Sequence, residues 1–166
     1  SDVYKRQFQD VGLIAKSRTK MHLAQAEGCS PIVTAFEQGN DHVLPVKPDT
    51  IAKSLAIGNP AAGPYSLEVL KETGGIGMAA KENTIIDGIR LLAETEGIFT
   101  ETAGGVVISS LKNLVKQGEI KKDEVTVAYI TGNGLKTMEA MGDFVDPVET
   151  TPDYETFQTA LATHQA

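Results

Sequence analysis

The chain has 166 residues, of which 41% are hydrophobic and 22% charged, the composition of roughly one ordinary globular domain. Its net charge of −7 argues against binding to nucleic-acid phosphates or to an anionic membrane surface. Apolar stretches fall short of the ~20 residues of a membrane span, and no charged-then-apolar leader opens the chain, so we expect neither membrane insertion nor secretion. Cys29 stands alone, which excludes a disulfide scaffold and favours a cytoplasmic location.

The two ends differ from the middle of the chain. Ser1 is not a start methionine, and no periodic pattern covers residues 1–7, so we predict a fragment with a non-native or disordered lead-in there. Apolar residues from 8 to 14 then resemble the last turns of a helix. A Thr-Pro-Asp sequence opens residues 151–166, which are predicted to form a closing surface helix. Residues 8–150 remain as the main domain.

The first half of the chain predicts short elements joined by turns. Residues 21–26 alternate weakly, as in a short strand, and Ser30 and Pro31 then open a helix, as its cap and its first residue. Residues 39–48 contain polar residues and prolines, which indicates a loop. A short helix is expected over 51–56, capped by Asp49 or Thr50 and stopped by the following Gly-Asn-Pro turn.

The later elements have clearer patterns. A helix is expected to end at Gly74-Gly75, followed by a weak strand over 76–79. Apolar residues recur at steps of three and four before Gly97 and again before Gly118, which predicts two amphipathic helices. Residues 125–130 are apolar and rich in β-branched side chains, as in a strand buried on both faces of a parallel sheet. This alternation of helices and strands predicts an α/β fold.

Glycine-containing turns at the ends of these elements are the candidate sites, because ligands gather at strand carboxyl ends and helix amino ends. Thr131-Gly132-Asn133-Gly134 follows the predicted strand, although it equally fits a tight turn without a ligand. At a helix start, Thr102 and Glu101 fit an ordinary cap and a favourable charge at the helix dipole. Gly104-Gly105 in the first turn costs about 1 kcal/mol per glycine, which close approach of a ligand or another backbone would offset.

The remaining reactive side chains are interpreted as structural rather than functional. The histidines, at positions 22, 42 and 164, lack metal-site spacing, so no metal is expected. Cys29 is read as a small buried residue and Lys53 as part of a solvated helix face. The turn at residues 57–60 is a third candidate site, although it equally fits a simple helix stop.

A longer ordered pattern includes these turns and resembles threonine synthase from about residue 8 to about residue 141. The blocks that carry the resemblance are QAEGCSPI at 25–32, TIAKSLAIGNP at 50–60, GIRLLAETEGIFTETAGG at 88–105 and TGNGLK at 131–136. The resemblance implies an incomplete large domain with a parallel sheet, of the tryptophan-synthase-β-like fold (fold type II). It also implies the cofactor pyridoxal 5'-phosphate and conversion of O-phospho-L-homoserine and water to L-threonine and phosphate.

The family's motifs also imply particular site residues. Thr131 is expected to hydrogen-bond the pyridine nitrogen, where its neutral hydroxyl would tune the electron-withdrawing strength of the ring. The segment Ala56, Ile57, Gly58 and Asn59 is expected against one ring face, and Glu101 and Thr102 are expected to line the site. The family's Schiff-base lysine, the asparagine beside the phenolic oxygen and the phosphate-binding glycine loop lie upstream of the matched part, so this piece is not expected to catalyse alone.

Other functions remain open at this point. A serine/threonine dehydratase or another pyridoxal-phosphate lyase would share the fold, and a non-catalytic paralogue would keep the pocket as a sensor. A small-molecule substrate is expected in each case, with no nucleic acid and no membrane, and the oligomeric state stays open.

Overall fold

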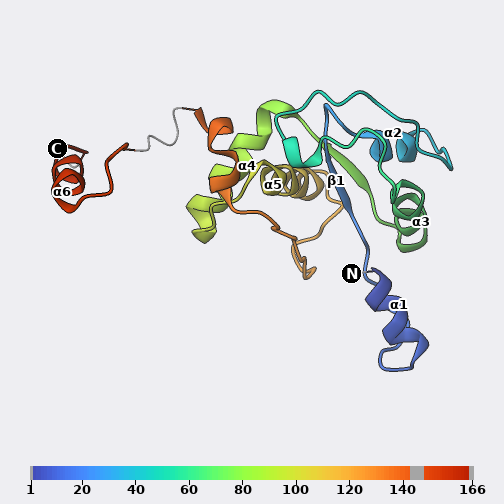
Figure 1. Cartoon of the computed structure of the whole chain (residues 1–166). Helices are drawn as coiled ribbons and strands as arrows, with labels where there is room; N and C mark the ends of the chain where they lie inside the picture. Colours follow the sequence, from blue (N-terminus) through green and yellow to red (C-terminus); the bar gives the residue numbers. More distant parts are fainter. Residues whose placement is uncertain (1, 143–147, 165–166) are drawn as a thin grey trace.

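The computed structural model describes residues 2–142 and 148–164. A two-stranded parallel sheet lies at its centre, built from β1 (Leu23–Ala26) and β2 (Gly77–Ala80), with Leu23 opposite Gly77 and Ala26 opposite Ala80. Helix α2 (Pro31–Glu37) packs on one face of the sheet and α5 (Thr102–Lys116) on the other (Figure 1). The predicted α/β fold with parallel strands is therefore confirmed, and both strands lie where the sequence predicted them.

Helices α2 and α3 (Gly63–Thr73) share a small core in which Ile32, Ala35 and Leu67 are buried. Pro31 begins α2 as predicted, but the Ser30 side chain does not cap it. The Gln25 side-chain oxygen does so instead, because it accepts from the backbone N–H groups of Ile32 and Val33, each at 3.0 Å. A strand residue thus supplies the acceptor that an N-cap side chain usually provides.

Helices α4 (Glu82–Glu96) and α5 cross in close contact. A Cβ atom added at Gly105 would lie 2.4 Å from the carbonyl oxygen of Ile85, and one at Gly88 would lie 2.5 Å from the carbonyl oxygen of Gly105. At Gly104 the added atom would meet the Thr100 hydroxyl at 2.0 Å. Close approach of protein atoms therefore accounts for both glycines in the first turn of α5, and they give no separate indication of a ligand.

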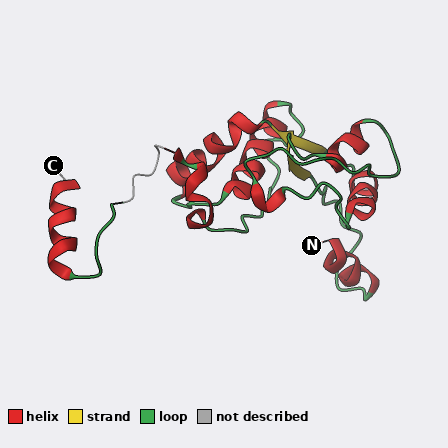
Figure 2. Ribbon diagram, turned by 45° about the horizontal axis from the view of Figure 1, so that its top comes forward, coloured by secondary structure: helices red, strands yellow, loops and turns green. Residues whose placement is uncertain are grey.

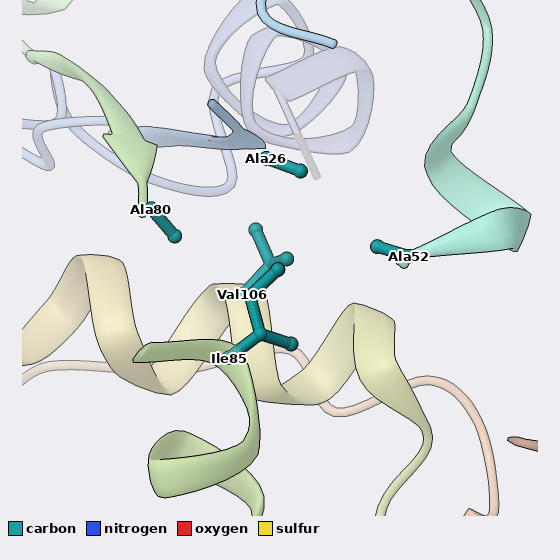
Figure 3. Packing of buried hydrophobic residues seen from close by; sticks show 5 residues of the cluster. All are labelled: Ala26, Ala52, Ala80, Ile85 and Val106. Atoms are coloured by element: carbon teal, nitrogen blue, oxygen red, sulfur yellow. The ribbon is translucent and has the colours of Figure 1, made fainter. Parts of the chain in front are cut away.

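The main core joins the sheet to α4, α5 and a distant loop (Figure 3). Its buried side chains converge from five segments of the chain: Ala26, Ala52, Ala80, Ile85 and Val106. Ala52 immediately precedes η1 (Lys53–Leu55), a short 3-10 helix in place of the predicted 51–56 helix. The loop before η1 agrees with the sequence pattern. Gly74 and Gly97 end their helices as predicted, with φ of 66° and 68°.

The expected strand over residues 125–130 is not formed. These residues pair with no strand in the described part of the chain, and Val125 and Val127 are 97% and 73% exposed. A buried strand needs a hydrogen-bonded neighbour as well as apolar side chains, and the apolar pattern reports only the second requirement. Beyond this segment the chain forms η2 (Gly134–Ala140).

The ends of the described chain are helical (Figure 2). Residues 1–7 are predicted to be a non-native or disordered lead-in, and the described part of this segment belongs to α1 (Asp2–Asp10). In α1, Arg6 pairs with Asp2 at 2.7 Å and with Glu72 at 2.6 Å. The apolar residues 8–14 are exposed rather than forming a buried helix face. The predicted closing helix is present as α6 (Tyr154–His164). No described helix is long and apolar enough to cross a membrane.

Candidate functional site

Two of the predicted site segments lie side by side, although they are about thirty residues apart in the chain. The carbonyl oxygen of Gly132 accepts from the backbone N–H of Glu101 at 3.1 Å and from the Thr100 hydroxyl at 2.9 Å. The backbone N–H of Gly134 donates to the carbonyl oxygen of Phe99 at 3.1 Å. These bonds place exposed Thr131 beside the start of α5, on the same side of the molecule as Glu101 and Thr102.

Glu101 is nearly covered, with 4% of its surface exposed. Its carboxylate lies against Gly132 and 3.5 Å from the Nζ atom of Lys136. A buried carboxylate requires a compensating charge or hydrogen bonds, and Lys136 supplies the charge. The segment that carries Thr131 thus also carries the cation that balances Glu101.

Thr102 is fully buried at the first position of α5. Its backbone N–H donates to the Thr137 hydroxyl at 3.3 Å, whereas its own Oγ1 has no hydrogen-bond partner among the described residues. Leaving a buried hydroxyl unpaired costs about 1–3 kcal/mol. An unsatisfied group of this kind at a helix amino end is suited to bind a polar ligand atom.

The third segment, Ala56 to Asn59, packs near the same helix. Ala52 and Leu55 belong to the core around Val106, which lies one turn beyond Thr102 in α5. Gly58 bonds back to Val46, since its carbonyl oxygen accepts from the Val46 N–H at 3.0 Å. Ala56 and Gly58 are half-buried, whereas Ile57 and Asn59 are exposed. The segment thus presents its backbone turn and two side chains at the surface.

Cys29 lies beneath this segment, with 1% of its surface exposed. Burial raises the pKa of its thiol, while a hydrogen bond with the Ile57 backbone acts in the opposite direction. The raised pKa keeps the thiol protonated and therefore weakly nucleophilic. Cys29 is accordingly a packing residue, as its sequence context predicted.

A large apolar groove lies elsewhere in the described structure. Its volume is about 1280 Å³, and β1, α3, α5 and residues 124–129 contribute to its walls. None of the predicted cofactor-facing residues lines it. Glu82 does not line the groove either. Its side chain lies where the turn after β1 meets the loop before η1, and the sequence analysis did not select it as a site residue.

Residues 6–132 match the sequence profile of the pyridoxal-phosphate dependent enzymes. The match covers most of the chain, and the chain belongs to this family. Its cofactor is pyridoxal phosphate, as the sequence resemblance implied.

Among curated proteins, the chain is similar to several threonine synthases. It is 39% identical over 136 residues to the one from Methanocaldococcus jannaschii, covering 81% of this chain and 33% of the relative. With the threonine synthase from Methanosarcina acetivorans it shares 35% identity over 144 residues, covering 85% of this chain and 35% of the relative. The chain thus spans about a third of the length of these relatives.

Solved structures of the same fold include a fungal L-serine ammonia-lyase from Rhizomucor miehei and maize serine racemase. The first has a TM-score of 0.55 at 20% identity, over 72% of this chain and 39% of the other. The second has a TM-score of 0.51 at 15% identity, over 85% of this chain and 37% of the other. These likenesses establish the fold-type-II architecture.

Proposed function

We propose that the protein carrying this chain is a threonine synthase, which converts O-phospho-L-homoserine and water to L-threonine and phosphate. The observation that carries the proposal is the contact of the Gly132 carbonyl oxygen with the Glu101 N–H and the Thr100 hydroxyl. It brings Thr131 next to Glu101 and Thr102, as one shared cofactor site requires. The identity of 35–39% to curated threonine synthases supports the particular reaction.

The chemistry of these residues fits pyridoxal phosphate. The exposed hydroxyl of Thr131 is available to the pyridine nitrogen, and the unpaired hydroxyl of Thr102 lacks the one partner that a bound oxygen would supply. Ala56, Ile57, Gly58 and Asn59 would lie against the ring face. When bound, the cofactor supplies an aromatic ring that withdraws electrons from an attached amino acid.

The chain's own residues would bind and orient the ring rather than transfer protons. Thr131 is neutral, so it would leave the ring nitrogen less fully protonated than a carboxylate would. Glu101 with Lys136 would fix the segment that carries Thr131. The lone buried cysteine and the metabolic role support a cytoplasmic location for the protein.

The test uses the gene product that carries this chain, at its natural length and with pyridoxal phosphate added. Phosphate release from O-phospho-L-homoserine is expected, with L-threonine as the co-product. Keto-acid formation from serine or threonine, without phosphate release, would replace the proposal with a dehydratase. A folded protein that binds the cofactor and turns over none of these substrates would indicate a non-catalytic paralogue.

Site-directed variants then test the role of Thr131. Thr131→Val should shift the visible absorption band of the bound cofactor and lower kcat by about tenfold or more, because the ring nitrogen loses a hydrogen bond. Thr126→Val, in the same extended segment, is the matched control and should change neither quantity. If the two variants have the same absorption band and the same kcat, Thr131 is excluded from the cofactor site.

A further inference from the structure

Glu82 joins three parts of the chain that meet at the carboxyl end of the sheet. It is the first residue of α4 and comes two positions after the end of β2. One carboxylate oxygen, Oε1, accepts from the backbone N–H of Gly28, which lies two residues beyond β1, at 3.0 Å. The other, Oε2, accepts from the Thr50 hydroxyl and from the Ile51 N–H, both at 3.0 Å.

The bonds around Glu82 extend into the proposed cofactor segment. The Thr50 hydroxyl, which donates to Glu82, accepts from the N–H of Ala52 at 3.0 Å. Ala52 is fully buried in the core that Figure 3 shows, and η1 follows it directly. The loop before η1 and the Glu82 side chain both lie close to Gly28. A Cβ atom added at Gly28 would lie 1.7 Å from the Asp49 carbonyl oxygen and 3.0 Å from Glu82 Oε1.

An ordinary structural role for a carboxylate at this position is to cap its own helix. Glu82 instead accepts hydrogen bonds from two other segments, 54 and 31 residues away in the chain. A negative charge in the first turn of α4 is favoured by the helix dipole, which makes the carboxylate a stable acceptor there. The side chain therefore fixes loops to each other, in addition to its place in α4.

We propose that Glu82 is a positioning residue, whose carboxylate holds residues 50–58 in the conformation that presents Ala56 to Asn59 to the cofactor. This inference rests on the proposed function of that segment. A loop that is ordered before the ligand arrives does not lose conformational entropy on binding, so affinity depends on the groups that order it. Glu82 acts through residues 50–58 and does not itself touch the ring.

Glu82→Gln tests the proposal in the natural-length gene product. The amide keeps the size of the side chain but offers one acceptor oxygen, so the backbone N–H of either Gly28 or Ile51 must lose its acceptor. Glu96→Gln, the same change near the other end of α4 at an exposed side chain, is the matched control. Thr50→Val removes the bond to Glu82 and also the acceptor of the Ala52 N–H, so it should act in the same direction.

Two measurements separate positioning from general destabilisation. Hydrogen exchange of the amides in residues 50–58 should accelerate at least about tenfold in Glu82→Gln, while exchange in the middle of α5 stays unchanged. The Kd for pyridoxal phosphate, read from the visible absorption band, should rise by about tenfold, and Glu96→Gln should match the unchanged protein.

A Kd for Glu82→Gln within twofold of the unchanged protein would overturn the positioning role. Equal acceleration of exchange in residues 50–58 and in α5 would also overturn it, because the effect would then be global. If the unchanged protein takes up no pyridoxal phosphate, the proposed function fails instead. The exchange measurement then still decides whether Glu82 orders the loop.

Discussion

The carboxylate of Glu101 occupies the space that a side chain at residue 132 would need. Its Oε1 atom lies 1.8 Å from the position of an added Cβ on Gly132, and the two backbones are joined by the Glu101 N–H to Gly132 carbonyl bond at 3.1 Å. This contact, rather than backbone conformation, favours glycine at residue 132, since its φ is not in the left-handed region. The side chain accepted at residue 132 therefore depends on the position of the Glu101 carboxylate.

Gly132→Ala should destabilise the protein by about 1–3 kcal/mol, because the buried Glu101 side chain has little room to move. The free energy of unfolding in urea measures the change. In the background of Glu101→Ala the same substitution should cost much less, since the obstructing side chain is gone. Additive costs in the double variant would show that the contact does not limit residue 132.

Gly105→Ala should destabilise the crossing of α4 and α5. The added methyl would lie 2.4 Å from the Ile85 carbonyl oxygen, a backbone atom that moves only if the helices separate. A cost of about 1–3 kcal/mol is expected in thermal or urea unfolding, despite the higher helix propensity of alanine. Gly63→Ala is the matched control in the first turn of α3. There the added atom meets a Val43 methyl at 2.9 Å, and a small shift of that side chain relieves the contact.

Thr102→Val should leave the stability of the cofactor-free protein unchanged or raise it by about 1 kcal/mol, because it removes a buried hydroxyl that has no hydrogen-bond partner. The same variant should bind pyridoxal phosphate more weakly if the hydroxyl meets the cofactor. Thr100→Val is the control: it is also fully buried, but its hydroxyl bonds Gly132 at 2.9 Å, so it should destabilise by about 1–2 kcal/mol. Equal losses of stability in both variants would contradict the difference in hydrogen bonding.

The stability of the fold should fall in mild acid through His22. Burial lowers the pKa of this imidazole and nearby Lys20 lowers it further, against the opposing effects of Glu119, Glu124 and the Ile76 backbone. The Nδ1 atom of His22 lies 3.2 Å from the Ile76 nitrogen and accepts its N–H. The unfolded chain, with a histidine pKa of about 6.5, therefore binds a proton more readily than the folded chain. The stabilising contribution is complete above that pH and is lost as the pH falls below it.

The measurement is the free energy of unfolding between about pH 7.5 and pH 5, where carboxylates with ordinary pKa values contribute little. His22→Asn should flatten the acid part of the profile, because the amide oxygen accepts a hydrogen bond without titrating in this range. A slope in His22→Asn that equals that of the unchanged protein would assign the acid sensitivity to other groups.

The amino-acid sequence by itself determined the elements whose causes are local. The apolar stripes of α4 and α5 and the glycines after α3 and α4 act within a few residues, so periodicity and turn chemistry suffice to place them. The short strands β1 and β2 were predicted for the same reason. The family resemblance selected Thr131, Glu101 and Thr102, and the fold brings these residues to one side of the molecule.

Only the tertiary structure decided which distant groups meet. Gln25 replaces Ser30 as the cap of α2, and Glu82 bonds two loops, because hydrogen-bond partners are set by three-dimensional proximity. Residues 125–130 form no strand for the same reason. Their β-branched pattern is typical of a strand, but pairing requires the edge of a neighbouring strand, which the local sequence does not reveal. Local sequence fixes what a segment is able to form, whereas packing between distant segments decides which hydrogen bonds and contacts it makes.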